Sequence, residues 1–102
     1  PIQNKPVKMQ TPVQIGDYSK GASHAYVLSI HEKVWIVWKE FDGEQESIWL
    51  QNSTDSGKNW NPAKSLAQTK NGSDHPFLIK DKGKVYIQWQ TNDDGFKLYS
   101  IN

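Results

Sequence analysis

The sequence repeats itself at an interval of about fifty residues, and this repeat limits the possible folds more than any other feature. Three segments of the first copy match the second copy in the same order: 21–28 with 72–79, 33–38 with 84–89, and, after a one-residue deletion, 48–52 with 98–102. Within these blocks His24 and His75 hold the same position. The repeat therefore indicates one structural unit that occurs twice.

Each copy contains short apolar runs of the kind that form β-strands. Units of about fifty residues with several such strands are typical of propeller blades rather than helical solenoids. In the second run, Val34, Ile36 and Trp38 alternate with Trp35 and Val37, which predicts a strand with two apolar faces. The predicted strands cover 24–30, 33–39, 47–52 and 63–68 in the first copy, and 75–80, 84–89 and 98–102 in the second.

The order of these strands predicts a circular permutation. Residues 13–15 resemble a fourth strand whose first three are missing, and the second copy lacks its own fourth strand. We therefore expect an all-β fold of two four-stranded antiparallel propeller blades that form part of a larger propeller. The predicted segments are an N-terminal closing strand in 1–16, blade one in 17–69 and an incomplete blade two in 70–102.

Two blades cannot close a ring, since propellers typically have four to eight. An unclosed pair would expose apolar faces. We therefore expect partners that complete the ring. They are either copies of this chain, each N-terminal strand completing a neighbour's last blade, or the remaining blades of a longer propeller.

The stretch from Ser53 to Trp60 has the pattern S-x-D-x-G-x-x-W. Asp55 and Ser53 can accept hydrogen bonds from backbone N–H groups in a turn, and Gly57 can supply a positive φ. This pattern resembles the Asp box of the sialidase-like (BNR-repeat) β-propellers, except that Asn59 stands where that family usually has Thr. The resemblance implies that these residues are structural and join the third and fourth strands of a blade. It also favours an extracytoplasmic or secreted location.

Sialidase activity of this chain alone is not expected. Sialidases hold the substrate carboxylate with three arginines, and the sequence contains no Arg. Three tyrosines, Tyr26, Tyr86 and Tyr99, share repeat positions with other aromatics and are interpreted as packing residues, whereas Tyr18 lies in a loop without a recognisable partner. The chain is therefore predicted to be non-catalytic.

Composition removes several other classes of function. The absence of Cys excludes disulfides and thiolate chemistry. No apolar run is long enough for a membrane span. The lysines are scattered along the chain, which does not favour nucleic-acid binding. No cofactor or metal is predicted.

The two equivalent histidines are candidate ligand-binding residues. His24 and His75 stand where a loop leads into the first strand of each copy, and Asp74 is next to His75. In sialidase-like propellers this position lies at the mouth of the central channel. Imidazoles there could bind a metal or an anion or respond to pH. Alternatively, each imidazole hydrogen-bonds a backbone carbonyl and shapes the loop.

The loops between the second and third strands are expected at the same mouth. Both are acidic and carry an aromatic residue, and their candidate ligand-binding residues are Asp42, Glu44, Asp93, Asp94 and Phe96. Carboxylates beside an aromatic ring suit a glycan. The sequence thus favours a non-catalytic binding or scaffolding module with a glycan or protein ligand. The alternative is a fragment of a sialidase-like glycoside hydrolase whose catalytic residues lie in other blades.

Overall fold

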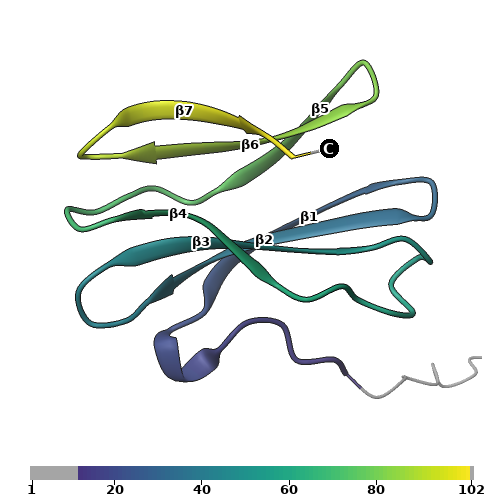
Figure 1. Cartoon of the computed structure of the whole chain (residues 1–102), viewed down its shortest axis with the longest axis horizontal. Coiled ribbons are helices and arrows are strands. Elements are labelled where there is room, and N and C mark those ends of the chain that lie inside the picture. Colours follow the sequence, from purple (N-terminus) through teal and green to yellow (C-terminus); the bar gives the residue numbers. More distant parts are fainter. Residues whose placement is uncertain (1–11, 102) are drawn as a thin grey trace, which may run out of the picture.

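The computed structural model describes residues 12–101, which form two antiparallel β-sheets (Figure 1). The first sheet has the order β1-β2-β3-β4 and the second β5-β6-β7, so each strand pairs with its neighbours in sequence. The strands are β1 (Ser23–Ile30), β2 (Lys33–Phe41), β3 (Glu46–Ser53), β4 (Lys64–Thr69), β5 (Phe77–Asp81), β6 (Lys84–Thr91) and β7 (Gly95–Ser100). A short 3-10 turn, η1 (Tyr18–Lys20), precedes β1.

The predicted all-β fold is confirmed, with strand ends that differ from the predicted ones by at most three residues. Residues 13–15, predicted as a closing strand, pair with no strand in the single chain. Their pairing with another copy or blade stays a prediction. The first sheet already has its own fourth strand, β4, so this segment has no free β3 edge beside it. Residues 1–11 of the predicted closing strand lie outside the described residues.

The pairing register corrects the third block of the repeat. Thr91 pairs with Gly95, whereas the equivalent Glu40 pairs with Ser47, so the second sheet turns sooner. As a result, the structural counterpart of Ile48 is Phe96 and not Leu98. The counterpart of Tyr99 is likewise Gln51 and not Trp49. The first two blocks keep the expected correspondence.

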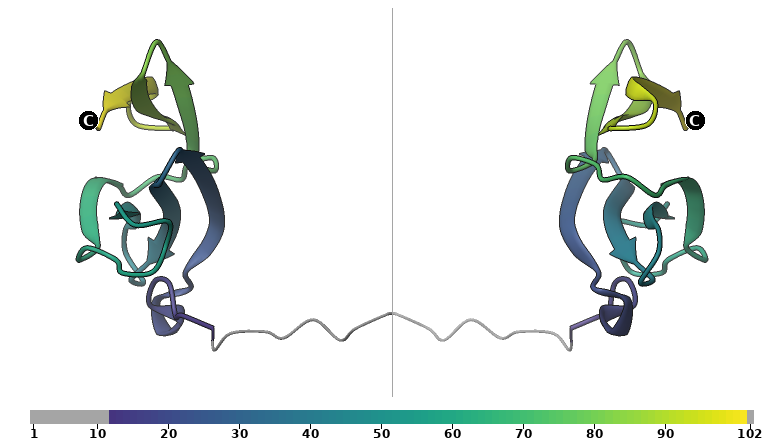
Figure 2. Two further views of the ribbon diagram at one scale, coloured as in Figure 1. Left: turned by 90° about the vertical axis from the view of Figure 1, so that its right-hand side faces the viewer. Right: turned by 90° about the vertical axis from the view of Figure 1, so that its left-hand side faces the viewer.

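The core lies between the two sheets, which are stacked one above the other in Figure 2. Its buried side chains are Trp35, Val37 and Ile48 from the first sheet and Leu78, Val85, Ile87 and Trp89 from the second. Burying each of these side chains contributes about 1.5–3 kcal/mol. The face-to-face contact of the sheets is therefore the main source of stability.

The opposite side of β2 is also buried, which confirms its two apolar faces. There Trp38 donates its indole N–H to Glu40 Oε2 over 2.7 Å, and the backbone N–H of Asp17 donates to the same oxygen over 3.0 Å. Gly16 lies directly on the indole with φ +77°, and a Cβ at this position would come within 2.7 Å of Trp38 Nε1. These contacts fix the segment before η1 against the far face of the first sheet.

The stretch from Ser53 to Trp60, for which we keep the name Asp box as a label only, closes the turn between β3 and β4. Asp55 accepts hydrogen bonds from Ser53 Oγ (2.7 Å), from Asn59 N (2.8 Å) and, at its other oxygen, from Asn59 Nδ2 (2.7 Å). Gly57 has φ +86° and donates its N–H to Ser53 Oγ. The side chain of Asn59, which departs from the usual Thr, thus satisfies the second carboxylate oxygen. These contacts lower the pKa of Asp55 to about 2, chiefly through Asn59.

Gly16→Ala is expected to destabilise the chain by about 1–3 kcal/mol more than Gly43→Ala. Both glycines have positive φ, so both substitutions strain the backbone, but a Cβ at Gly43 would meet no atom within 4 Å. Urea unfolding of the two variants measures the difference. Equal losses would contradict the tight packing of Gly16 on Trp38.

Asp55→Asn is expected to reduce stability in a pH-dependent manner. Because the folded pKa of about 2 lies below the ordinary value of 3.8, the ionised carboxylate stabilises the fold above pH 3.8, and this contribution is lost as the pH falls toward 2. The difference in unfolding free energy between wild type and variant should therefore shrink over this range. A difference that is constant with pH would contradict the role of the charge.

Candidate functional site

The predicted site residues gather at one end of the two sheets. The β2–β3 loop, the segment between β4 and β5, and the β6–β7 loop all lie at the left of Figure 1. The Asp box and the β1–β2 and β5–β6 turns lie at the opposite end. We call the first of these the loop end. The Asp box is therefore remote from the candidate site.

The structure brings the two histidines together. The rings of His24 and His75 stack with their centroids 3.7 Å apart and their planes at 24°. His24 adopts a positive φ of 58°, and Ser23 Oγ lies 3.0 Å from its Nδ1. The sequence placed the two residues at equivalent positions, but their direct contact follows only from the stacking of the sheets.

A second pair of rings extends the histidine pair. Tyr26 and Phe77 hold equivalent positions in β1 and β5, and their rings meet edge to face with centroids 5.7 Å apart. Both remain about two-fifths exposed, so the prediction that Tyr26 is a packing residue holds only in part. His24, His75, Tyr26 and Phe77 form what we call the four-ring cluster. Aromatic surfaces of this kind hold ligands by stacking.

The surroundings of His24 act on the charge of its imidazole ring. The pKa of His24 is lowered from 6.5, first by desolvation and then by the nearby His75 and Lys39, while Glu46 acts in the opposite direction. Two stacked imidazolium rings would repel each other, so the neutral form of His24 is favoured.

A polar network joins the two sheets beneath the histidines. Lys39 Nζ lies 3.3 Å from Glu46 Oε2 and donates a hydrogen bond to the carbonyl oxygen of Ser73 over 3.1 Å. Ser73 Oγ donates to the same Glu46 carboxylate. Lys39 is only 9% exposed. Its position in a strand with two apolar faces is the one sequence signal that distinguishes this lysine from the scattered surface lysines.

Two of the predicted acidic ligands instead hold their loops in shape. Asp42 accepts hydrogen bonds from the backbone N–H groups of Gln45 (2.8 Å) and Glu44 (2.9 Å), which lower its pKa. Asp93 accepts from Asn71 Nδ2 (2.6 Å) and Thr69 Oγ1 (2.7 Å), which lower its pKa and link the β6–β7 loop to the first sheet.

The other predicted residues are open to solvent at the loop end. Asp74 and His75 are exposed and line a cavity of about 160 Å³ together with Phe77. Glu44 is exposed, as is Phe96 at 58%. The Asp94 side chain is 56% exposed and lies 3.9 Å from Lys97 Nζ. These groups are open to solvent, and within residues 12–101 the side chains of Glu44 and Asp94 accept no hydrogen bond from a loop backbone.

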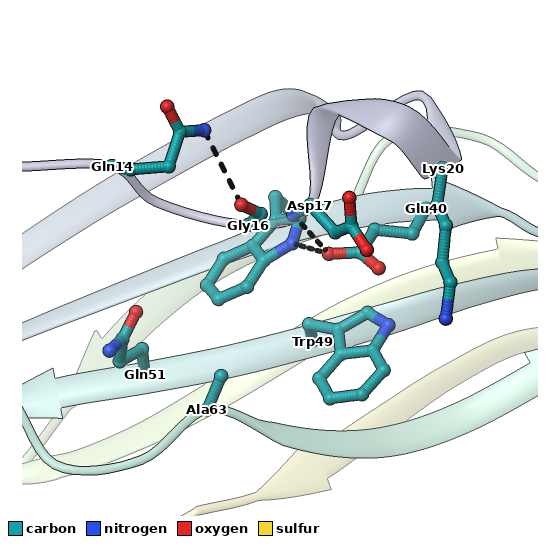
Figure 3. A pocket seen from close by; sticks show the side chains of 9 residues that line it. Gln14, Gly16, Asp17, Lys20, Glu40, Trp49, Gln51 and Ala63 are labelled. Atoms are coloured by element: carbon teal, nitrogen blue, oxygen red, sulfur yellow. Dashed lines mark hydrogen bonds between the residues drawn. The ribbon is translucent and has the colours of Figure 1, made fainter.

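A second hollow, which the sequence did not indicate, lies on the far face of the first sheet (Figure 3). Its volume is about 300 Å³, and Trp49 forms its floor with Gln51 and Ala63 to one side. In the same view, the side chains of Glu40 and Lys20 extend from above toward the indole of Trp49. The hollow adjoins the loop end, because Lys20, Glu40 and Trp49 also line a cavity of about 210 Å³ with Asp42.

No group of three or more His, Asp or Glu side chains within residues 12–101 is placed to hold a metal ion. None of the helical residues in this range forms a segment able to cross a membrane. Comparison with family models, curated proteins and solved structures found no match. Functional proposals for this chain therefore rest on its own residues.

The lowered pKa of His24 predicts that the chain loses stability on mild acidification. Because the folded pKa of His24 lies below its ordinary 6.5, the free energy of unfolding should fall as the pH drops below 6.5. His24→Asn should remove part of this fall. Urea unfolding between pH 5 and pH 8, roughly the range over which histidine titrates, measures it.

His31→Asn is the matched control. His31 also has a positive φ, 54°, but lies in the β1–β2 turn at the other end of the sheet. Asn tolerates this backbone conformation, so both variants leave the strain similar. A pH dependence that changes equally in the two variants would contradict a role for the stacked pair.

Proposed function

We propose that the chain is a non-catalytic binding or scaffolding module of the sialidase-like propeller type, with a glycan or protein ligand held at the loop end. The observation that carries this proposal is the four-ring cluster. His24, His75, Tyr26 and Phe77 come from both sheets and remain exposed at the start of the two first strands. A solvent-facing row of aromatic rings is a binding surface rather than core packing.

Polar groups beside the rings support a ligand rich in hydroxyl or amide groups. Asp74 lines the same cavity as His75 and Phe77. Asp94 and Phe96 add an exposed carboxylate and a further ring at the loop end. Apolar rings with a few polar groups are the usual make-up of a ligand site.

The absence of catalysis is supported by the composition and by the use of the carboxylates. A chain without Arg cannot build an arginine triad. Asp42 and Asp93, which could have served as an acid and a base, are occupied by hydrogen bonds within and between loops. Their lowered pKa values favour the charged form and oppose a role as a proton donor.

One observation favours the alternative, a piece of a sialidase-like glycoside hydrolase with catalytic residues in other blades. We call the face of the second sheet that points away from the first sheet its far face. It exposes Phe96 and Leu98, each at 58%, and further blades of a longer chain would cover them. Arginines contributed by such blades would support this alternative.

A glycan array probed with the purified chain tests the proposal. For any glycan retained, Phe77→Ala should weaken binding about fivefold, since loss of one aromatic contact costs about 1 kcal/mol. Asp94→Asn should also weaken it. The control is Leu66→Ala, which removes an apolar side chain 36% exposed on β4.

Binding that persists unchanged in Phe77→Ala would place the ligand elsewhere. An array without any retained glycan would reject the glycan and leave a protein ligand. Asp94 is preferred to Asp93 for this test, because Asp93→Asn would also disturb the contacts with Thr69 and Asn71.

A further inference from the structure

We propose that the far face of the second sheet is the docking surface for a second copy of this chain, which presents the far face of its first sheet. The internal repeat carries this proposal, because the two sheets already make the same contact within one chain. The proposal concerns the faces of the sheets, and Phe96 of the proposed ligand site lies on the same face. Its test measures the mass of the assembly, whereas the glycan array measures ligand binding, so failure of one proposal is distinguishable from failure of the other.

The far face of the second sheet carries apolar residues at the positions that the first sheet buries in the core between the sheets. The counterparts given by the register are Leu28 and Ile79, Trp35 and Tyr86, Ile48 and Phe96, and Leu50 and Leu98. Ile48 is fully buried, whereas Phe96 is 58% exposed. The same positions thus lie in the core in one sheet and open to solvent in the other.

These side chains surround a hollow that a neighbouring sheet would fill. Ile79, Tyr86 and Leu98 line it with Lys80 and Asp81, and its volume is about 570 Å³. Ile79 and Leu98 are 37% and 58% exposed. Exposed apolar surface grouped in this way marks an interaction site.

The first sheet carries the complementary set on its own far face. The counterparts are Leu78 and Val27, Val85 and Val34, Ile87 and Ile36, and Trp89 and Trp38. Leu78 is 3% exposed against the first sheet, whereas Val27 is 56% exposed. The first sheet thus carries the same apolar pattern on its far face, where Val27 is open to solvent and Ile36 and Trp38 are 8% and 2% exposed within the single chain.

Within residues 12–101, the segment before η1 covers only part of this surface. Gly16 and Asp17 cover Trp38, but the segment before β5 covers Trp89 in a similar way, with Trp89 Nε1 donating to the carbonyl oxygen of Asp74 over 3.0 Å. That cover still leaves Leu78 and Ile87 in contact with the first sheet. Val27 likewise remains open.

An interface of this kind is head to tail, because the two chains contribute different surfaces. Such contacts form closed rings when the rotation closes and filaments when it does not. A ring is the expected result, since the sheets are stacked in the manner of propeller blades.

Light scattering of the purified chain after size exclusion tests the proposal. The wild type should have the mass of an assembly of two or more chains. Val27→Glu and Leu98→Glu should each give monomers, because each places a carboxylate in one half of the apolar interface. Both positions are more than half exposed, so the fold of each monomer should persist, as circular dichroism and urea unfolding can verify.

An equimolar mixture of the two variants supplies the sharpest result. Each variant keeps one intact face, so the mixture should form a one-to-one dimer that neither variant forms alone. Thr54→Glu adds the same charge at an exposed Asp-box position and should leave the wild-type mass unchanged. If either glutamate variant unfolds, Val27→Gln and Leu98→Gln are used in its place.

A monomeric wild type at high micromolar concentration would overturn the proposal. So would a mixture that remains monomeric, since a head-to-tail interface requires complementation. Dissociation by Thr54→Glu would overturn it as well, because the effect would then be one of net charge.

Discussion

The packing of the two sheets on each other is the interaction on which the remaining structure depends. A β-sheet that is apolar on one face gains stability by burying that face against another element. Here Val37 and Ile48 of the first sheet and Val85 and Ile87 of the second are fully buried against one another. The same contact sets His24 on His75 and Tyr26 against Phe77, because the sheets are equivalent units stacked in sequence order. The candidate ligand surface is therefore a product of the core.

The polar network beneath the histidines fixes the alignment of the two sheets on each other. Lys39 and Glu46 come from the first sheet, and Ser73 comes from the segment that leads into the second. A buried lysine costs free energy unless it is paired and hydrogen-bonded, as it is here. Apolar contact alone would tolerate sliding of one sheet on the other, whereas these bonds are satisfied in one arrangement only. The network also holds Asp74 and His75 at the loop end.

The sequence predicted the strands because apolar alternation reports local burial. It failed at the third block of the repeat for a physical reason. The assumed counterpart of Ile48, Leu98, is two residues from the true one, Phe96, and side chains two residues apart on a strand point to the same face. A slip of two residues preserves the apolar pattern, so only the pairing of Thr91 with Gly95 reveals it. Acidic composition did not predict that Asp42 and Asp93 also hold their loops in shape through hydrogen bonds, and ligand binding by these two residues stays a prediction. The stacking of the histidines and the burial of Lys39 depend on contacts between sheets, which no local pattern encodes.

Gln88 shows how the two halves of the repeat differ. It holds the position of the fully buried Val37, but it lies half-buried on the far face of the second sheet. An amide at the centre of an apolar surface retains water or requires a polar partner, so a contact made there is weaker than the dry one inside the chain. In the proposed assembly, the contact within the chain would therefore be stronger than the contact between chains. Dilution would then separate the copies first and leave the two sheets of each chain packed on each other.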